Sequence, residues 1–239
     1  MELLLLPGMD GSGLLFAPLL QALQQQAPAL RCRVIAYPQH GAQDYATLGQ
    51  MLETQLPASG QPWWLLAESF SGPLGIQLAA SRPSGLQGLI LAASFARAPR
   101  RLLRALAPLL PWLPPLSPTL LPPALLRHAL LSADATPALQ QLLQQALANS
   151  SGAVLRARLH SIAHSDARPQ LAQLQALPGL YLQAEADRLL PAQCADEIRQ
   201  IWPTCQLQRL TGSHCLLQTN PQHCATALLD FIATQGMNA

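Results

Sequence analysis

A serine at the end of an apolar run is the most informative residue of this chain. The run 63–67 stops at Glu68 and Ser69, and a helix-like segment follows at 73–80. The order strand, sharp turn, helix can expose a nucleophilic serine at the carboxyl end of a sheet. Small residues are needed two positions before and after such a serine, and here they are Ala67 and Ser71. A buried strand-end serine without chemistry is the competing interpretation.

A serine hydroxyl becomes a good nucleophile only when a base accepts its proton, and that base is commonly a histidine oriented by a carboxylate. Asp187 follows an expected strand closely, with Glu185 as its competitor and a helix N-cap as its non-catalytic interpretation. His214 follows a glycine turn after the last expected strand. Because the chain order serine, aspartate, histidine is typical of this arrangement, we expect Ser69, Asp187 and His214 to form a catalytic triad.

Acyl transfer also requires N–H donors for the oxyanion of the transition state. One expected donor is the amide of Phe70, directly after the serine. The other is the amide of Met9, in the glycine-rich segment 7–13 after the first expected strand. A phosphate-binding function for this segment lacks the Lys-Ser/Thr pair, and its glycine spacing does not fit a dinucleotide site.

Short apolar segments alternate with helical patterns along most of the chain. The expected strands are 2–6, 34–37, 63–67, 88–92, 180–183 and 206–210, and the expected helices are 14–26, 45–55, 73–80, 191–201 and 221–234. This alternation predicts an α/β fold with a mostly parallel sheet of about six strands and helices on both faces.

The segment 97–177 breaks the alternation, because it is Leu-rich, helical in pattern and interrupted by prolines. An insertion on the carboxyl side of an open sheet lies over the ligand crevice. We therefore expect a helical lid at 97–177, inserted in a core made of 1–96 and 178–239. Apolar lid residues suited to an aliphatic acyl chain are Trp112, Leu113 and Leu116.

The lid segment carries eight arginines and two aspartates, a balance of +6, whereas the rest of the chain has a balance of −4. The excess fits either a solvated face in an arginine-biased protein or a docking patch for an acyl carrier or an anionic surface. The candidates for docking are Arg97, Arg100, Arg101 and Arg104.

Composition excludes several function classes. A net charge of +2 over 239 residues argues against a nucleic-acid partner, and the absence of lysine excludes a Schiff-base or phosphate-loop lysine. The five cysteines contain no C-x-x-C pair, so we expect free thiols, no metal site and no cofactor. No segment is long and apolar enough for a membrane span or a signal peptide, which predicts a cytoplasmic protein.

In the segment 7–13, the elbow at Ser69, and the positions of Asp187 and His214, the chain resembles the α/β-hydrolase superfamily over its whole length. The resemblance is closest to small lidded bacterial serine esterases and thioesterases, with the sheet trimmed to about six strands. Pro7 stands where many members have histidine, and Ala67 and Ser71 replace glycines.

The resemblance implies a serine hydrolase that cleaves a carboxylic ester or thioester of a mainly apolar acyl group through an acyl-enzyme on Ser69. Two alternatives stay open: acyl transfer to an alcohol acceptor, and a non-catalytic ligand-binding protein on a hydrolase fold.

Overall fold

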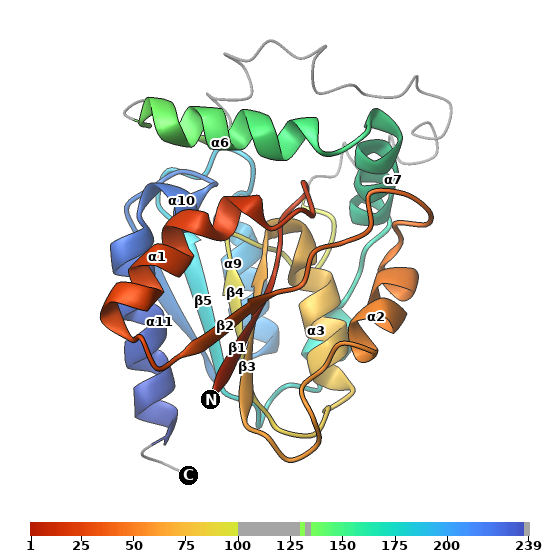
Figure 1. Ribbon diagram of the computed structural model, residues 1–239. Helices are drawn as coiled ribbons and strands as arrows, with labels where there is room; N and C mark the ends of the chain where they lie inside the picture. Colours follow the sequence, from red (N-terminus) through yellow and green to blue (C-terminus); the bar gives the residue numbers. More distant parts are fainter. Residues whose placement is uncertain (100–129, 132–134, 237–239) are drawn as a thin grey trace.

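The computed structural model describes residues 1–99, 130–131 and 135–236, and a six-stranded sheet forms its centre (Figure 1). The strand order is β2-β1-β3-β4-β5-β6, and every neighbouring pair is parallel. The predicted α/β fold and six-stranded sheet are therefore confirmed. The strands are β1 Glu2–Leu6, β2 Arg31–Val34, β3 Trp63–Glu68, β4 Leu86–Ala92, β5 Gly179–Ala184 and β6 Cys205–Leu210.

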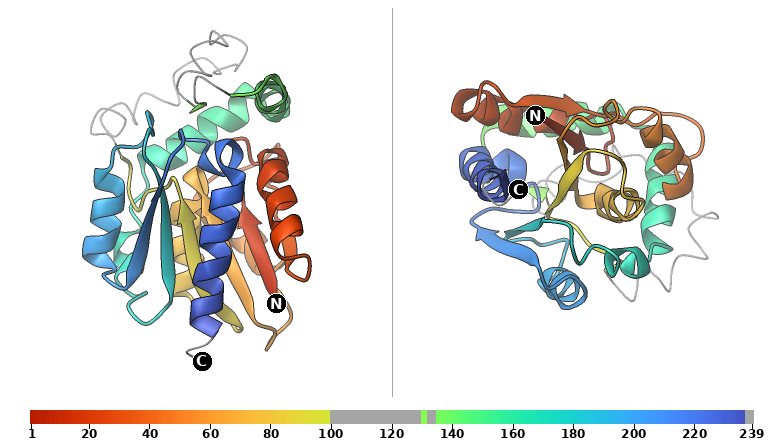
Figure 2. Two further views of the ribbon diagram at one scale, coloured as in Figure 1. Left: turned by 90° about the vertical axis from the view of Figure 1, so that its left-hand side faces the viewer. Right: turned by 90° about the horizontal axis from the view of Figure 1, so that it is seen from below.

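Helices cover both faces of the sheet (Figure 2). One face carries α1 Ala17–Gln26, α10 Leu216–Thr219 and α11 Pro221–Gly236; the other carries α2 Tyr45–Glu53, α3 Gly72–Ala80, α8 Arg168–Leu171 and α9 Gln193–Ile201. Side chains alternate along a strand, so β1 supplies Leu3 and Leu5 to the first core and Leu4 and Leu6 to the second. A strand buried on both faces needs a continuous apolar run, which is what β1 has.

Two further helices, α6 Pro137–Ala148 and α7 Gly152–Ala163, lie above the carboxyl edge of the sheet (Figure 1). Each begins at a capping side chain, since Thr136 accepts from the Leu139 amide and Ser151 from the Val154 amide. Leu139 and Leu143 of α6 pack on Cys215 of the core. Helix α8 also lies within 97–177, but it packs between α3 and α9 on one face of the sheet. That the whole segment 97–177 forms a single lid therefore stays a prediction.

The second strand lies earlier than the sequence predicts. We expected a strand at 34–37, whereas β2 pairs with β1 over Arg31–Val34. The apolar character of Ile35 and Tyr37 reflects burial beside the loop after β1, because the Tyr37 amide donates to the Gly11 carbonyl 2.7 Å away. Burial around a site and pairing in a sheet leave the same apolar signal in a sequence.

All five cysteines are unpaired, as expected. Among the helices of the described ranges, none has the length and apolarity that crossing a membrane requires.

Candidate active site

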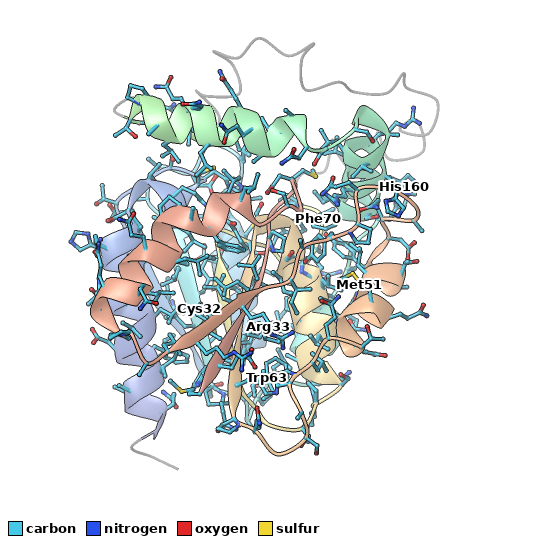
Figure 3. All side chains as sticks on the ribbon, viewed as in Figure 1. Cys32, Arg33, Met51, Trp63, Phe70 and His160 are labelled. Carbon is cyan, nitrogen blue, oxygen red and sulfur yellow. The ribbon has the colours of Figure 1, made fainter. Side chains whose placement is uncertain are left out.

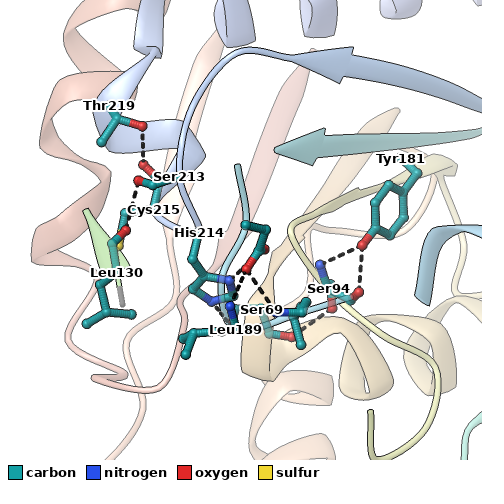
Figure 4. Close-up of polar contacts among 11 residues, drawn as sticks. Ser69, Ser94, Leu130, Tyr181, Leu189, Ser213, His214, Cys215 and Thr219 are labelled. Atoms are coloured by element: carbon teal, nitrogen blue, oxygen red, sulfur yellow. Dashed lines mark hydrogen bonds and ion pairs between the residues drawn. The ribbon is translucent and has the colours of Figure 1, made fainter. Parts of the chain in front are cut away.

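Ser69 lies at a strained turn between β3 and α3. Strand β3 ends at Glu68, a single 3-10 turn covers Ser69–Ser71, and α3 starts at Gly72. The φ angle of Ser69 is +48°, a conformation that costs a non-glycine residue on the order of 1 kcal/mol or more. The Ser94 hydroxyl holds the turn by donating to the Ser69 carbonyl at 2.7 Å, and the Tyr181 hydroxyl donates to the Ser94 carbonyl (Figure 4). Contacts from β5 and from the segment after β4 therefore hold the strained turn in place.

A continuous hydrogen-bonded chain joins the three residues that we selected as a triad (Figure 4). Ser69 Oγ lies 2.9 Å from Nε2 of His214, and Nδ1 of the same ring lies 2.8 Å from Oδ2 of Asp187. Each residue follows the carboxyl end of a different strand, β3, β5 or β6, and parallel strands bring those ends together. The imidazole thus faces a hydroxyl with one nitrogen and a carboxylate with the other.

The second oxygen of the Asp187 carboxylate is also held. Its Oδ1 accepts hydrogen bonds from the amides of Leu189 and Leu190, both at 2.8 Å. The side chains of Asp187 and His214 are each about 8% exposed, so little water competes for the bond between them. Glu185, the competing acid, instead accepts from the Thr211 hydroxyl at 2.9 Å.

The loop after β1 also lies close to Ser69. A side chain at Gly8 would lie 3.9 Å from Cβ of Ser69, so the loop backbone passes directly beside the nucleophile. Among the described residues, neither the Met9 amide nor the Phe70 amide donates a hydrogen bond to another part of the chain, and Phe70 lies in the first turn of its helix, where amides lack partners within the helix. Both amides are therefore available to a ligand, as an oxyanion hole requires.

The serine at position 71 performs a contact that a glycine could not. Its buried hydroxyl bonds to the carbonyl of Pro7 and to the hydroxyl of Tyr37. Tyr45 completes the support, because its hydroxyl donates to the Phe70 carbonyl at 2.8 Å and its ring stacks on the Phe70 ring. The departure from the glycine pattern thus links the turn at Ser69 to the loop after β1. Sequence analysis did not single out either tyrosine.

Glu68, directly before the nucleophile, is a buried carboxyl that sequence analysis left without a function. Burial raises its pKa from 4.5 to about 7, while a hydrogen bond from the Gln218 amide, 2.9 Å away, lowers it. The sequence did contain a signal for a buried acid at this position, because Glu68 is the last residue of an otherwise apolar strand. A carboxyl there has no polar neighbours along its own strand and needs a partner from elsewhere in the fold.

Ser69 does not line either of two cavities in the described part of the chain, and only one of them is lined by a triad residue, Asp187. One of about 290 Å³ is bounded by α1, α6 and α10, and another of about 470 Å³ lies behind Asp187. The expected acyl-binding residues lie outside the described residues; they are Trp112, Leu113 and Leu116.

The expected docking arginines divide into two groups. Arg97 is paired with Glu197 at 2.7 Å, and Arg100, Arg101 and Arg104 lie outside the described residues. Arg158, which the sequence counts as part of the charged lid face, is instead completely buried. That part of the surface interpretation is wrong, because α7 turns this side chain inward onto the core.

A parallel α/β sheet with a serine at a strained strand–helix turn and a histidine–carboxylate pair beside it defines the α/β-hydrolase class of proteins. The model of the family described as serine aminopeptidase, S33, matches residues 21–216. The chain therefore belongs to this α/β-hydrolase family. No curated protein matches the sequence.

Solved structures with the same fold cover nearly the whole chain. An enol-lactonase from Burkholderia xenovorans is 16% identical with a TM-score of 0.77, over 97% of this chain and 91% of the other. A hydrolase from Pseudomonas aeruginosa is 21% identical with a TM-score of 0.77, over 97% and 89%. An esterase from Exiguobacterium antarcticum is 15% identical with a TM-score of 0.76, over 98% and 92%. At these identities the likeness establishes the fold.

Proposed function

We propose that this hydrolase cleaves a carboxylic ester or thioester through an acyl-enzyme on Ser69. The observation that carries the proposal is the unbroken chain from Ser69 Oγ through both nitrogens of His214 to Asp187. A protein that only binds its ligand has no chemical need for a strained serine, a base and an oriented acid together.

In the first half-reaction Ser69 Oγ forms a bond to the carbonyl carbon while its proton passes to Nε2 of His214. The carbonyl oxygen becomes an oxyanion, which the amides of Met9 and Phe70 bind. The carbon–oxygen or carbon–sulfur bond to the leaving group then breaks, and His214 donates its proton to the departing alcohol or thiol. Asp187 keeps the ring oriented and stabilises its cationic form.

In the second half-reaction a water molecule attacks the acyl carbon while His214 accepts its proton. The bond between the acyl carbon and Ser69 Oγ breaks, His214 returns a proton to Oγ, and a carboxylic acid leaves. An alcohol in place of water would yield a new ester, which is the acyltransferase alternative. Product analysis with and without added alcohol separates the two reactions.

The substrate that we propose has a mainly apolar acyl group. The support is the Leu- and Pro-rich composition of 97–177, together with structural neighbours that are an enol-lactonase and an esterase. The family description names serine aminopeptidases, and the same triad chemistry can cleave an amide. We further propose that Arg100, Arg101 and Arg104 dock an acyl carrier or an anionic surface that presents the substrate.

The test combines a substrate panel with variants of the three residues. The panel contains p-nitrophenyl esters and acyl thioesters of graded length, with an aminoacyl p-nitroanilide for the peptidase alternative. We expect Ser69→Ala to lower kcat on the order of 10⁴-fold or more, His214→Ala nearly as much and Asp187→Asn less. A fluorophosphonate should label the wild-type protein and leave Ser69→Ala unlabelled. Full activity of purified Ser69→Ala would falsify the mechanism.

A further inference from the structure

The loop after β1 has every backbone carbonyl from Pro7 to Gly11 engaged in a hydrogen bond. The core supplies the Ser71 hydroxyl to Pro7 and the Tyr37 amide to Gly11, and the loop itself supplies the Gly11 amide to Gly8. The other two carbonyls are reached from the region above the sheet edge. The Met9 carbonyl accepts from Arg158 Nη1 of α7 at 2.8 Å, and the Asp10 carbonyl accepts from Ser150 Oγ at 2.7 Å and also from Gln39 Nε2 at 3.1 Å.

Arg158 is placed in an unusual way for an arginine. It is 0% exposed, and its remaining hydrogen bonds go to Gln43 Oε1 at 3.0 Å and to the Pro38 carbonyl at 3.2 Å. Within the described ranges it has no carboxylate at ion-pair distance. Burial lowers its pKa, which reflects the cost of taking the guanidinium out of water. A buried charge that binds only neutral acceptors contributes little to the free energy of unfolding, because the cost of desolvation offsets its hydrogen bonds.

The surroundings of the guanidinium are shaped to receive it. Gly11 has φ of +66°, and a Cβ there would lie only 2.4 Å from Arg158 Nη1, so the loop leaves room for the side chain by having glycine. The guanidinium carbon also lies 5.7 Å from the centre of the Tyr37 ring and 6.0 Å from that of Phe70. In the view of Figure 3, Phe70 appears below the level of α6.

We infer that Arg158, assisted by Ser150, is a positioning residue that fixes the backbone of the loop after β1, residues 7–13. We call this segment the oxyanion loop, because Met9 is one of the two proposed donors to the oxyanion. The inference rests on the proposed function, because it assigns the Met9 and Phe70 amides to the oxyanion. Arg158 contacts the residue that carries each donor: it binds the Met9 carbonyl and lies against the Phe70 ring. A loop with glycines at 8, 11 and 13 is free to adopt many conformations, and donors stabilise a transition state best when their geometry is fixed beforehand. Helix α7 therefore acts in turnover by holding the loop.

The test compares variants that release the loop with one that loosens α7 elsewhere. Arg158→Met removes the bond to the Met9 carbonyl, and Arg158→Lys leaves one nitrogen in place of the guanidinium fork. Ser150→Ala removes the shorter of two hydrogen bonds to the Asp10 carbonyl and leaves the one from Gln39 Nε2 at 3.1 Å. The matched control is Ser161→Ala, because Ser161 on α7 donates to the Gln43 carbonyl at 3.1 Å and does not touch the oxyanion loop. Kinetics with a small p-nitrophenyl ester measure kcat and KM, and circular dichroism checks that each variant is folded.

We expect Arg158→Met to lower kcat by about 10- to 100-fold with KM changed less than about threefold, since small misplacement of catalytic donors has effects of this size. Arg158→Lys and Ser150→Ala should lie between this variant and the wild type. The shape of the pH dependence of kcat should not change, because the Ser69–His214–Asp187 chain is intact. The inhibition constant of a trifluoromethyl ketone, whose adduct fills the oxyanion hole, should rise in parallel with the loss of kcat. Ser161→Ala should behave like the wild type.

Several results would overturn the inference. One is a folded Arg158→Lys or Ser150→Ala protein with wild-type kcat and inhibitor affinity; another is an equal loss in Ser161→Ala. If Arg158→Met does not fold, the Lys and Ser150 variants decide the question. Activity that survives in Ser69→Ala would defeat the proposed function itself, whereas an inactive Ser69→Ala beside a fully active Arg158→Met would defeat only this inference.

Discussion

Replacing Glu68 by glutamine should stabilise the protein above neutral pH and change its stability little in mild acid. The pKa of the Glu68 carboxyl is raised to about 7: burial is the largest cause and nearby Asp10 adds to it, whereas the Gln218 amide and His214 lower the pKa. The folded protein therefore keeps Glu68 protonated over a pH range in which the unfolded chain has released this proton. Glutamine has no such cost, because it is neutral at every pH and can still accept from Gln218.

The size of the effect follows from the two pKa values. A rise from 4.5 to about 7 is worth roughly 3 kcal/mol, since a tenfold change in a proton equilibrium corresponds to about 1.4 kcal/mol. The contribution of Glu68 to stability is fully present below about pH 4.5, falls as the pH rises to about 7, and is then constant. The free energy of unfolding of Glu68→Gln, relative to wild type, should thus increase by roughly 2–3 kcal/mol between about pH 5 and about pH 8.

Urea unfolding of both proteins at a series of pH values measures this difference directly. Glu53→Gln is the matched control, because Glu53 is an exposed glutamate near the end of α2. Its stability relative to wild type should stay nearly constant over the same range. If the difference between Glu68→Gln and wild type does not change with pH, or changes in the opposite direction, the carboxyl does not carry the cost that we assign to its burial.

Two further predictions concern packing and surface charge. Gly75→Ala should lower the free energy of unfolding by about 1–3 kcal/mol, because the new Cβ would lie 2.8 Å from Cβ of Ala67. Gly49→Ala in α2 should raise the free energy of unfolding by about 0.5–1 kcal/mol, since its new Cβ would meet nothing closer than 3.7 Å. Urea unfolding measures both changes, and changes of the same sign would refute the packing argument. Combining Arg100→Glu with Arg101→Glu should lower kcat/KM for a carrier-bound acyl substrate, and make it less salt-dependent, while sparing a small neutral ester. If both substrates respond alike, or neither responds, these arginines are ordinary surface residues.

The order of elements and the positions of the three residues were predictable because their signals are local. Strands β1 and β3 are uninterrupted apolar runs, and Ser69, Asp187 and His214 each follow a strand end. In a parallel sheet all carboxyl ends lie at one edge, so residues after different strands become neighbours without any detail of packing. The same local logic failed for β2, where an apolar segment is buried beside a loop and is not paired in the sheet.

The sequence by itself determined the α/β class, the strand–turn–helix around Ser69 and the chain order of serine, aspartate and histidine, because each depends on neighbouring residues. Only the tertiary structure decided that Arg158 is buried against the loop after β1 and that Glu68 is a buried acid with a raised pKa. The partners that decide these two cases are 149 residues away for Arg158 and Met9, and 150 residues away for Glu68 and Gln218. The charge state and orientation of a side chain depend on its burial and its partners, and both arise only when distant segments pack together.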